Sequence, residues 1–159
     1  MPDEDVRLVD LAAQLKDLRQ AEVLLLTCMD FRFFEQIAAV MGEAGLTGKY
    51  DHVILAGAAL GAVEPRVEHW HQTFFDHLDL AVKLHNVKAV IVLEHRDCGA
   101  YSPKGFGLLP DNPTRKEERR VHFEQVAELQ KKLPPSLGFI AGLLEKLEKE
   151  DALTCDQLV

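Results

Sequence analysis

Three residues with metal-binding side chains lie directly after two apolar runs. Cys28 follows the run 23–26, and His95 and Cys98 follow the run 90–93. Short runs of valine, leucine and isoleucine are typical of buried strands in a parallel sheet, and open α/β sheets build their sites at the carboxyl ends of the strands. Two thiolates and one imidazole that converge there make a three-ligand zinc set with a fourth position left over. The sequence therefore predicts a zinc (Zn²⁺) site between two strand ends.

Four apolar stretches predict the strands that position these residues, at about 22–27, 53–55, 88–93 and 137–143. Apolar residues at helical spacing predict helices at 34–41 and 67–82, and Thr114 begins a capping box that opens a further helix. This alternation predicts an α/β fold: a parallel four-stranded central sheet flanked by helices, in a single domain. The spacing over 5–20 predicts one more helix. We therefore expect an N-terminal helical arm at residues 1–20 and a zinc-binding α/β domain at 21–159.

Length, composition and charge narrow the function classes. A chain of 159 residues with 47% apolar residues has ample material for one hydrophobic core, and a net charge of −8 argues against nucleic acid and anionic membrane surfaces as partners. No apolar run is long enough to span a bilayer. The acidic start of the chain lacks the basic residues of a signal peptide, so we expect a cytoplasmic protein. Three cysteines are too few for a disulfide framework and favour ligands or nucleophiles.

Two short motifs carry a resemblance to a known family. The first, C-x-D-x-R, begins at Cys28, and the second, H-x-x-C-G, begins at His95. Together they resemble the paired signature of the β-class carbonic anhydrases, and the resemblance covers residues 22–100 best. It implies zinc bound by the two cysteines and the histidine, and reversible hydration of carbon dioxide to bicarbonate by attack of zinc-bound hydroxide. It also implies a homodimer, or a dimer of dimers, with the N-terminal helix packed across a two-fold interface.

The resemblance assigns a catalytic dyad to Asp30 and Arg32. Asp30 would accept a hydrogen bond from the hydroxide and aim its lone pair at the substrate. Arg32 would hold Asp30 through a bidentate pair, which keeps the carboxylate ionised and off the metal. If that pair broke, Asp30 could become the fourth ligand and close the site. The sequence does not choose between the open and the closed arrangement.

Two departures from the family pattern bear on the substrate. The family has an Asn-Ala-Gly-Asn-like loop after the second strand, whereas this chain has Ala56, Gly57 and Ala58, which with Gly99 we expect to line the substrate pocket. Glu94 replaces the glycine that normally precedes the zinc histidine, which adds bulk and charge near a ligand. The apolar pocket wall suits carbonyl sulfide or carbon disulfide, so hydrolysis of these compounds is an alternative function. A non-catalytic, zinc-stabilised homologue that acts as an assembly module is another.

Other polar residues have simpler interpretations. His69, His71 and His77 could suggest a second metal or a proton shuttle, but on an amphipathic helix His69 and His77 are expected to face solvent or a partner subunit. Asp97 is expected to make local hydrogen bonds in a loop. The charged run 115–120 alternates basic and acidic residues, so it is expected to form a solvated helix face. The ligand cysteines could also be buried apolar thiols, but the charged and histidine neighbours favour metal binding. A cysteine nucleophile is disfavoured because neither thiol has a base nearby in the sequence.

Overall fold

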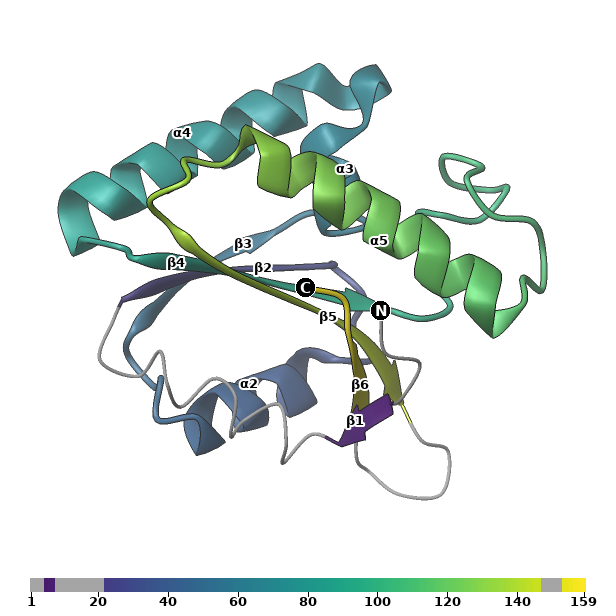
Figure 1. Cartoon of the computed structure of the whole chain (residues 1–159), viewed down its shortest axis with the longest axis horizontal. Helices are drawn as coiled ribbons and strands as arrows, with labels where there is room; N and C mark the ends of the chain where they lie inside the picture. Colours follow the sequence, from purple (N-terminus) through teal and green to yellow (C-terminus); the bar gives the residue numbers. More distant parts are fainter. Residues whose placement is uncertain (1–4, 8–21, 147–152) are drawn as a thin grey trace.

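The computed structural model describes residues 5–7, 22–146 and 153–159, and its centre is a six-stranded sheet (Figure 1). The strand order is β1-β6-β5-β4-β2-β3. The predicted parallel four-stranded sheet is confirmed by four strands, namely β2 (Val23–Thr27), β3 (Tyr50–Ile54), β4 (Ala89–His95) and β5 (Gly138–Lys146). Two antiparallel strands, β6 (Leu153–Gln157) and β1 (Asp5–Arg7), extend the sheet beyond β5.

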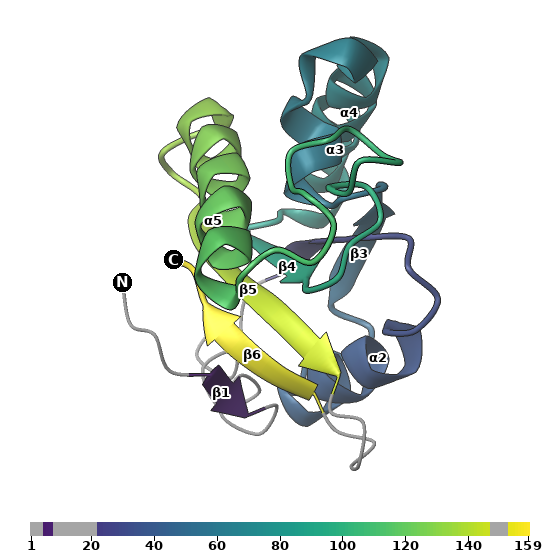
Figure 2. The same ribbon diagram turned by 90° about the vertical axis from the view of Figure 1, so that its right-hand side faces the viewer.

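Helices cover both faces of the sheet (Figures 1 and 2). One face carries α2 (Phe34–Glu43). The other face carries the short α3 (Ala59–Val63), a 3-10 turn η2 (Pro65–Val67), α4 (Glu68–His85) and α5 (Arg115–Lys132). Their ends follow the local sequence: Asn86 adopts the left-handed conformation after α4, and the Thr114 side chain accepts a hydrogen bond of 3.1 Å from the backbone N–H of Glu117.

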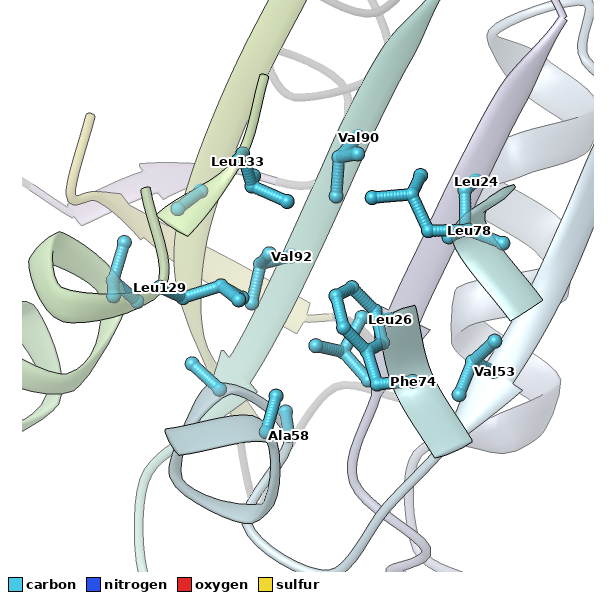
Figure 3. Packing of buried hydrophobic residues seen from close by; sticks show 14 of the residues in the cluster. Leu24, Leu26, Val53, Ala58, Phe74, Leu78, Val90, Val92, Leu129 and Leu133 are labelled. Carbon is cyan, nitrogen blue, oxygen red and sulfur yellow. The ribbon is translucent and has the colours of Figure 1, made fainter. Parts of the chain in front are cut away.

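The core consists of an apolar layer on each side of the sheet. Because side chains alternate along a strand, Leu24 and Leu26 face α3 to α5, whereas Val23 and Leu25 face α2. The first layer, shown in Figure 3, includes Phe74 and Leu78 of α4 and Leu129 of α5 with the side chains of β2 and β4. Strands buried on both faces explain why β2 and β4 read as continuous apolar runs in the sequence.

The structure corrects two predictions. The helix expected over residues 5–20 is wrong for Asp5–Arg7, which pair with β6 as a strand; residues 8–20 lie outside the described part of the chain, so the helical arm stays a prediction. Helical spacing is a property of neighbouring residues, so it cannot predict that a segment will pair with a strand far away in the sequence. The solvated face expected at 115–120 is wrong for Glu118 and Arg119, which are buried.

In the described ranges, no helix is both long and apolar enough to cross a membrane.

Candidate metal centre

The three expected metal ligands lie together at the carboxyl ends of β2 and β4. Thr27 of β2 pairs with Leu93 of β4, so the loop after β2 and the loop after β4 begin next to each other. Cys28 is the first residue after β2, and His95 is the last residue of β4. With Cys98 they form a group whose ligand atoms all lie within 4.8 Å of one another, and all three side chains are buried. The two sulfur atoms are 3.8 Å apart.

The donor atoms of this group fit a zinc ion. The Nδ1–H of His95 donates to the carbonyl oxygen of Arg96 over 2.8 Å, which leaves Nε2 as the unprotonated nitrogen. That Nε2 is buried and has no hydrogen-bond partner among the described residues. A buried polar atom without a partner is costly, and a metal would satisfy it together with the two sulfurs. The group can therefore bind a metal, and its chemistry suits zinc.

One of the two thiols is readily ionised. The hydrogen bond from Cys98 is the largest influence on Cys28, and it lowers the pKa of the Cys28 thiol to about 4 despite burial. The backbone N–H of Gly57 also donates to the Cys28 sulfur, over 3.4 Å. The pKa of Cys98 changes in the opposite direction: its hydrogen bond to Cys28 and its burial both raise it. A thiolate is the form that coordinates metal, so Cys28 presents a ligand in its binding form.

Asp30 and Arg32 form a bidentate ion pair beside this group. Arg32 Nη2 donates to Asp30 Oδ2 over 2.7 Å, and Arg32 Nε and its backbone N–H each donate to Oδ1 over 3.0 Å. These bonds lower the pKa of Asp30 and raise that of Arg32. Asp30 Oδ2 also lies 3.7 Å from the unpartnered Nε2 of His95. The carboxylate is therefore ionised and adjacent to the space that a metal would occupy.

Arg32 also connects the dyad to the loop between the ligands. Its Nη1 donates to Asp97 Oδ2 and its Nη2 donates to the Asp97 carbonyl oxygen, both over 3.1 Å. Asp97 was expected to make local hydrogen bonds in its loop, but these bonds join it to Arg32, which lies far away in the chain. A single guanidinium group thus bridges the loop after β2 and the loop after β4.

The four expected pocket residues have different surroundings. Gly57 adopts a positive φ of 77°, and a Cβ there would lie 3.0 Å from Leu60 Cβ and 3.1 Å from Ala100 Cβ, so a larger residue would be strained and tightly packed. Ala58 is fully buried and packs in the core layer of Figure 3. Ala56 is half-buried and Gly99 is exposed. A substrate pocket lined by these four residues stays a prediction.

Sequence reasoning missed a buried polar cluster behind the ligand group. Glu94 is 1% exposed and accepts a 2.7 Å hydrogen bond from the hydroxyl group of Tyr101, whose ring stacks on His122 at a centroid distance of 3.9 Å. His95 stacks instead on Phe33, at 4.6 Å. Because successive side chains of a strand point to opposite faces, Glu94 lies across the sheet from the ligand that follows it. The expected charge near a ligand therefore acts on Cys98, whose pKa the Glu94 carboxylate helps to raise, and the Glu94 side chain does not lie on the side of His95. The available signal was a glutamate inside an apolar strand, which needs a buried partner.

The fold and the site together define a class of protein: an α/β protein whose parallel sheet carries a Cys–His–Cys metal-binding group at the carboxyl ends of its strands. Comparison with known families then places the chain. The family described as "putative carbonic anhydrase" matches residues 18–143, and the chain belongs to this family, a divergent group similar to the β-carbonic anhydrases.

Two curated proteins are similar to this chain in sequence. An uncharacterized protein of Rickettsia bellii is 37% identical over 112 residues, which is 69% of this chain and 66% of the relative. An uncharacterized protein of Rickettsia conorii is 38% identical over 87 residues, which is 55% of this chain but only 47% of the relative. The chain thus spans less than two thirds of the length of these curated relatives.

Two solved structures from Aspergillus fumigatus share the fold. A variant of the β-carbonic anhydrase CafD has a TM-score of 0.59 at 11% identity and covers 96% of this chain and 99% of its own. The β-carbonic anhydrase CafA has a TM-score of 0.57 at 16% identity and covers 94% and 87%. At these identities the likeness shows the fold alone.

Proposed function

We propose that this chain is a zinc-dependent carbonic anhydrase that catalyses the reversible hydration of carbon dioxide to bicarbonate. The observation that carries the proposal is the buried group of Cys28, His95 and Cys98, whose ligand atoms lie within 4.8 Å of one another and whose imidazole Nε2 has no partner in the described part of the chain. Membership of a carbonic anhydrase family supports the choice of reaction.

The roles of the residues follow from their contacts. Zinc in this group would act as a Lewis acid and make water a nucleophile near neutral pH. Cys28, His95 and Cys98 would hold the ion and leave one position for water or substrate. Asp30 would accept a proton or hydrogen bond at that position, because its Oδ2 lies 3.7 Å from His95 Nε2. Arg32 would keep Asp30 ionised and would engage both of its carboxylate oxygens, so that Asp30 stays off the metal, and we favour the open arrangement.

The test is a stopped-flow assay of carbon dioxide hydration on protein loaded with zinc. The expected result is zinc-dependent turnover that is lost in Cys98→Ser, which lacks one ligand. Wild-type protein that holds one zinc per chain without turnover would refute carbonic anhydrase activity. That outcome would favour the non-catalytic, zinc-stabilised module.

Hydrolysis of carbonyl sulfide or carbon disulfide is the second candidate. The loop at 55–59 favours it, because this loop lacks polar side chains and offers the metal group only the backbone N–H of Gly57. An apolar wall would suit these less polar substrates. Carbonyl sulfide hydrolysis measured beside carbon dioxide hydration separates the two candidates by the larger kcat/KM.

We also propose that the active protein is a homodimer or a dimer of dimers in which both chains line each pocket. Phe31, between the two residues of the dyad, is 86% exposed, and Met29 is 64% exposed. Apolar side chains this exposed beside a site are typical of a surface that a partner covers. Light scattering at low micromolar concentration should give at least twice 17.8 kDa. A monomer with full activity would refute the proposal, and deletion of residues 1–20 should reduce solubility and activity together.

A further inference from the structure

We propose that Glu118 of α5 is a positioning residue for the metal centre, because its carboxylate holds the turn that connects His95 to Cys98. The proposal rests on the metal-binding role given above. It assigns a function in the site to a helix that supplies no ligand.

The turn between the two ligands depends on one residue in an unusual conformation. Asp97 has a positive φ of 56°, a region that residues other than glycine adopt infrequently, although aspartate tolerates it better than most. This conformation reverses the chain directly after β4, so that Cys98 returns toward His95 within three residues. A positive φ of this kind persists only where surrounding contacts hold it. The contacts of Asp97 therefore decide whether the two ligand atoms stay together.

Glu118 supplies the contact to the backbone of that residue. Its Oε1 accepts a hydrogen bond of 2.6 Å from the Asp97 N–H, and its Oε2 lies 3.3 Å from Arg96 Nη1. Glu118 is only 8% exposed. A charge-assisted hydrogen bond away from solvent is strong and directional. One carboxylate thus contacts both residues that separate His95 from Cys98.

The same turn also positions the dyad. Arg32 donates to the side chain and the carbonyl oxygen of Asp97, and the same guanidinium group holds Asp30. A shift of the turn would move the Arg32 contacts with it. Glu118 therefore acts on the ligand pair directly and on Asp30 through Asp97 and Arg32.

The helix that carries Glu118 is itself firmly placed. Val126 and Leu129 on α5 are fully buried in the core layer above β4. One turn after Glu118, His122 is also fully buried and stacks on Tyr101, the residue three positions after Cys98. Helix α5 thus contacts the loop of the candidate ligands at Asp97, through Glu118, and at Tyr101, through His122. It can therefore serve as a rigid support for the contact between Glu118 and Asp97.

The test compares metal binding in Glu118→Ala, Glu118→Gln and Leu129→Ala. Zinc affinity is measured by competition with a chelator, and the geometry of the thiolate site is measured from the absorption spectrum of the cobalt-substituted protein. Glu118→Ala should weaken zinc binding by about tenfold to a hundredfold, as loss of supporting contacts around metal ligands generally does, and should alter the cobalt spectrum. Glu118→Gln should restore most of the affinity, because its amide oxygen can still accept from Asp97. Leu129→Ala removes core packing about three turns beyond Glu118, while His122 and Val126 still hold the helix beside it, so it should lower the melting temperature and leave zinc affinity unchanged.

Two results would overturn the proposal. The first is wild-type affinity and spectrum in Glu118→Ala, and the second is an equal loss of affinity in Leu129→Ala. If Glu118→Ala does not fold, the test compares Glu118→Asp with Glu118→Gln. The shorter side chain of Glu118→Asp should fail to reach Asp97, so this variant should bind zinc more weakly than Glu118→Gln. The reverse order of affinities would overturn the proposal. A protein that binds zinc without hydrating carbon dioxide would refute the proposed activity alone, since neither measurement here uses turnover.

Discussion

Removal of the Arg32 side chain tests the dyad most directly. In Arg32→Ala, Asp30 keeps only the backbone hydrogen bond of 3.0 Å and loses the donors Nε and Nη2. Hydrogen bonds to a charged group contribute about 1.5–3 kcal/mol. The Arg32 side chain is 39% exposed, so solvent screens part of the interaction, and about 1–2 kcal/mol is the expected loss. That loss corresponds to about a 5- to 30-fold decrease in kcat/KM for hydration. Asp30→Ala removes the acceptor itself and should lower kcat/KM by about a hundredfold or more.

The pH dependence separates orientation from protonation. Arg32 lowers the pKa of Asp30, so its loss returns that pKa toward the usual value of about 3.9. Asp30 remains ionised at neutral pH in the variant, and the loss of hydration activity should therefore persist across pH 6–9. The pair stabilises the fold above the unfolded-state pKa, and this contribution disappears as the pH falls through the lower folded-state pKa. Urea unfolding of metal-free protein should show the Arg32→Ala deficit at pH 7 and a smaller deficit near about pH 3.

A second ion pair in the chain provides the control. Arg66 donates to Glu64 Oε1 over 2.6 Å in the same two-residue spacing, and neither residue belongs to the proposed ligand set or to the dyad. Arg66→Ala should lower stability without a change in hydration, and both arginine variants should retain zinc. Unchanged turnover in both Asp30→Ala and Arg32→Ala would reduce the dyad to a structural ion pair.

Three further outcomes are expected. Purified protein should contain about one zinc per chain by elemental analysis, and Cys98→Ser or His95→Ala should lose most of it; full occupancy in either variant contradicts the ligand set. Phe74 is fully buried between α4 and the sheet, so Phe74→Ala should lower the free energy of unfolding in urea by about 3–5 kcal/mol, and a negligible change would mean that this layer contributes little. Tyr101→Phe removes the hydroxyl group that donates to buried Glu94 and should cost about 1–3 kcal/mol with zinc retained, whereas a stable variant would show that Glu94 finds another donor.

The sequence by itself determined the parallel sheet and the edge of the sheet at which the three candidate ligands lie. The apolar runs before Cys28 and His95 predict adjacent buried strands, and parallel strands end at the same edge of a sheet. The candidate ligands that directly follow such strands therefore lie at the same edge of the sheet. They converge because β2 and β4 are neighbours in the strand order, which the tertiary structure supplies. The Asp30–Arg32 pair could be predicted for the same kind of reason, because a spacing of two residues lets the guanidinium group reach the carboxylate without help from the rest of the fold.

Only the tertiary structure decided what lies behind that site. Charged and polar residues occur all around α5, so periodicity does not indicate which of them face inward, and the burial of Glu118 and His122 depends on how the helix is rotated on the sheet. Their partners, Asp97 and Tyr101, precede them by about twenty residues in a loop without periodicity. A short motif specifies chemistry because its residues are neighbours in the chain, whereas the support of that chemistry depends on contacts that exist only after the helix has packed.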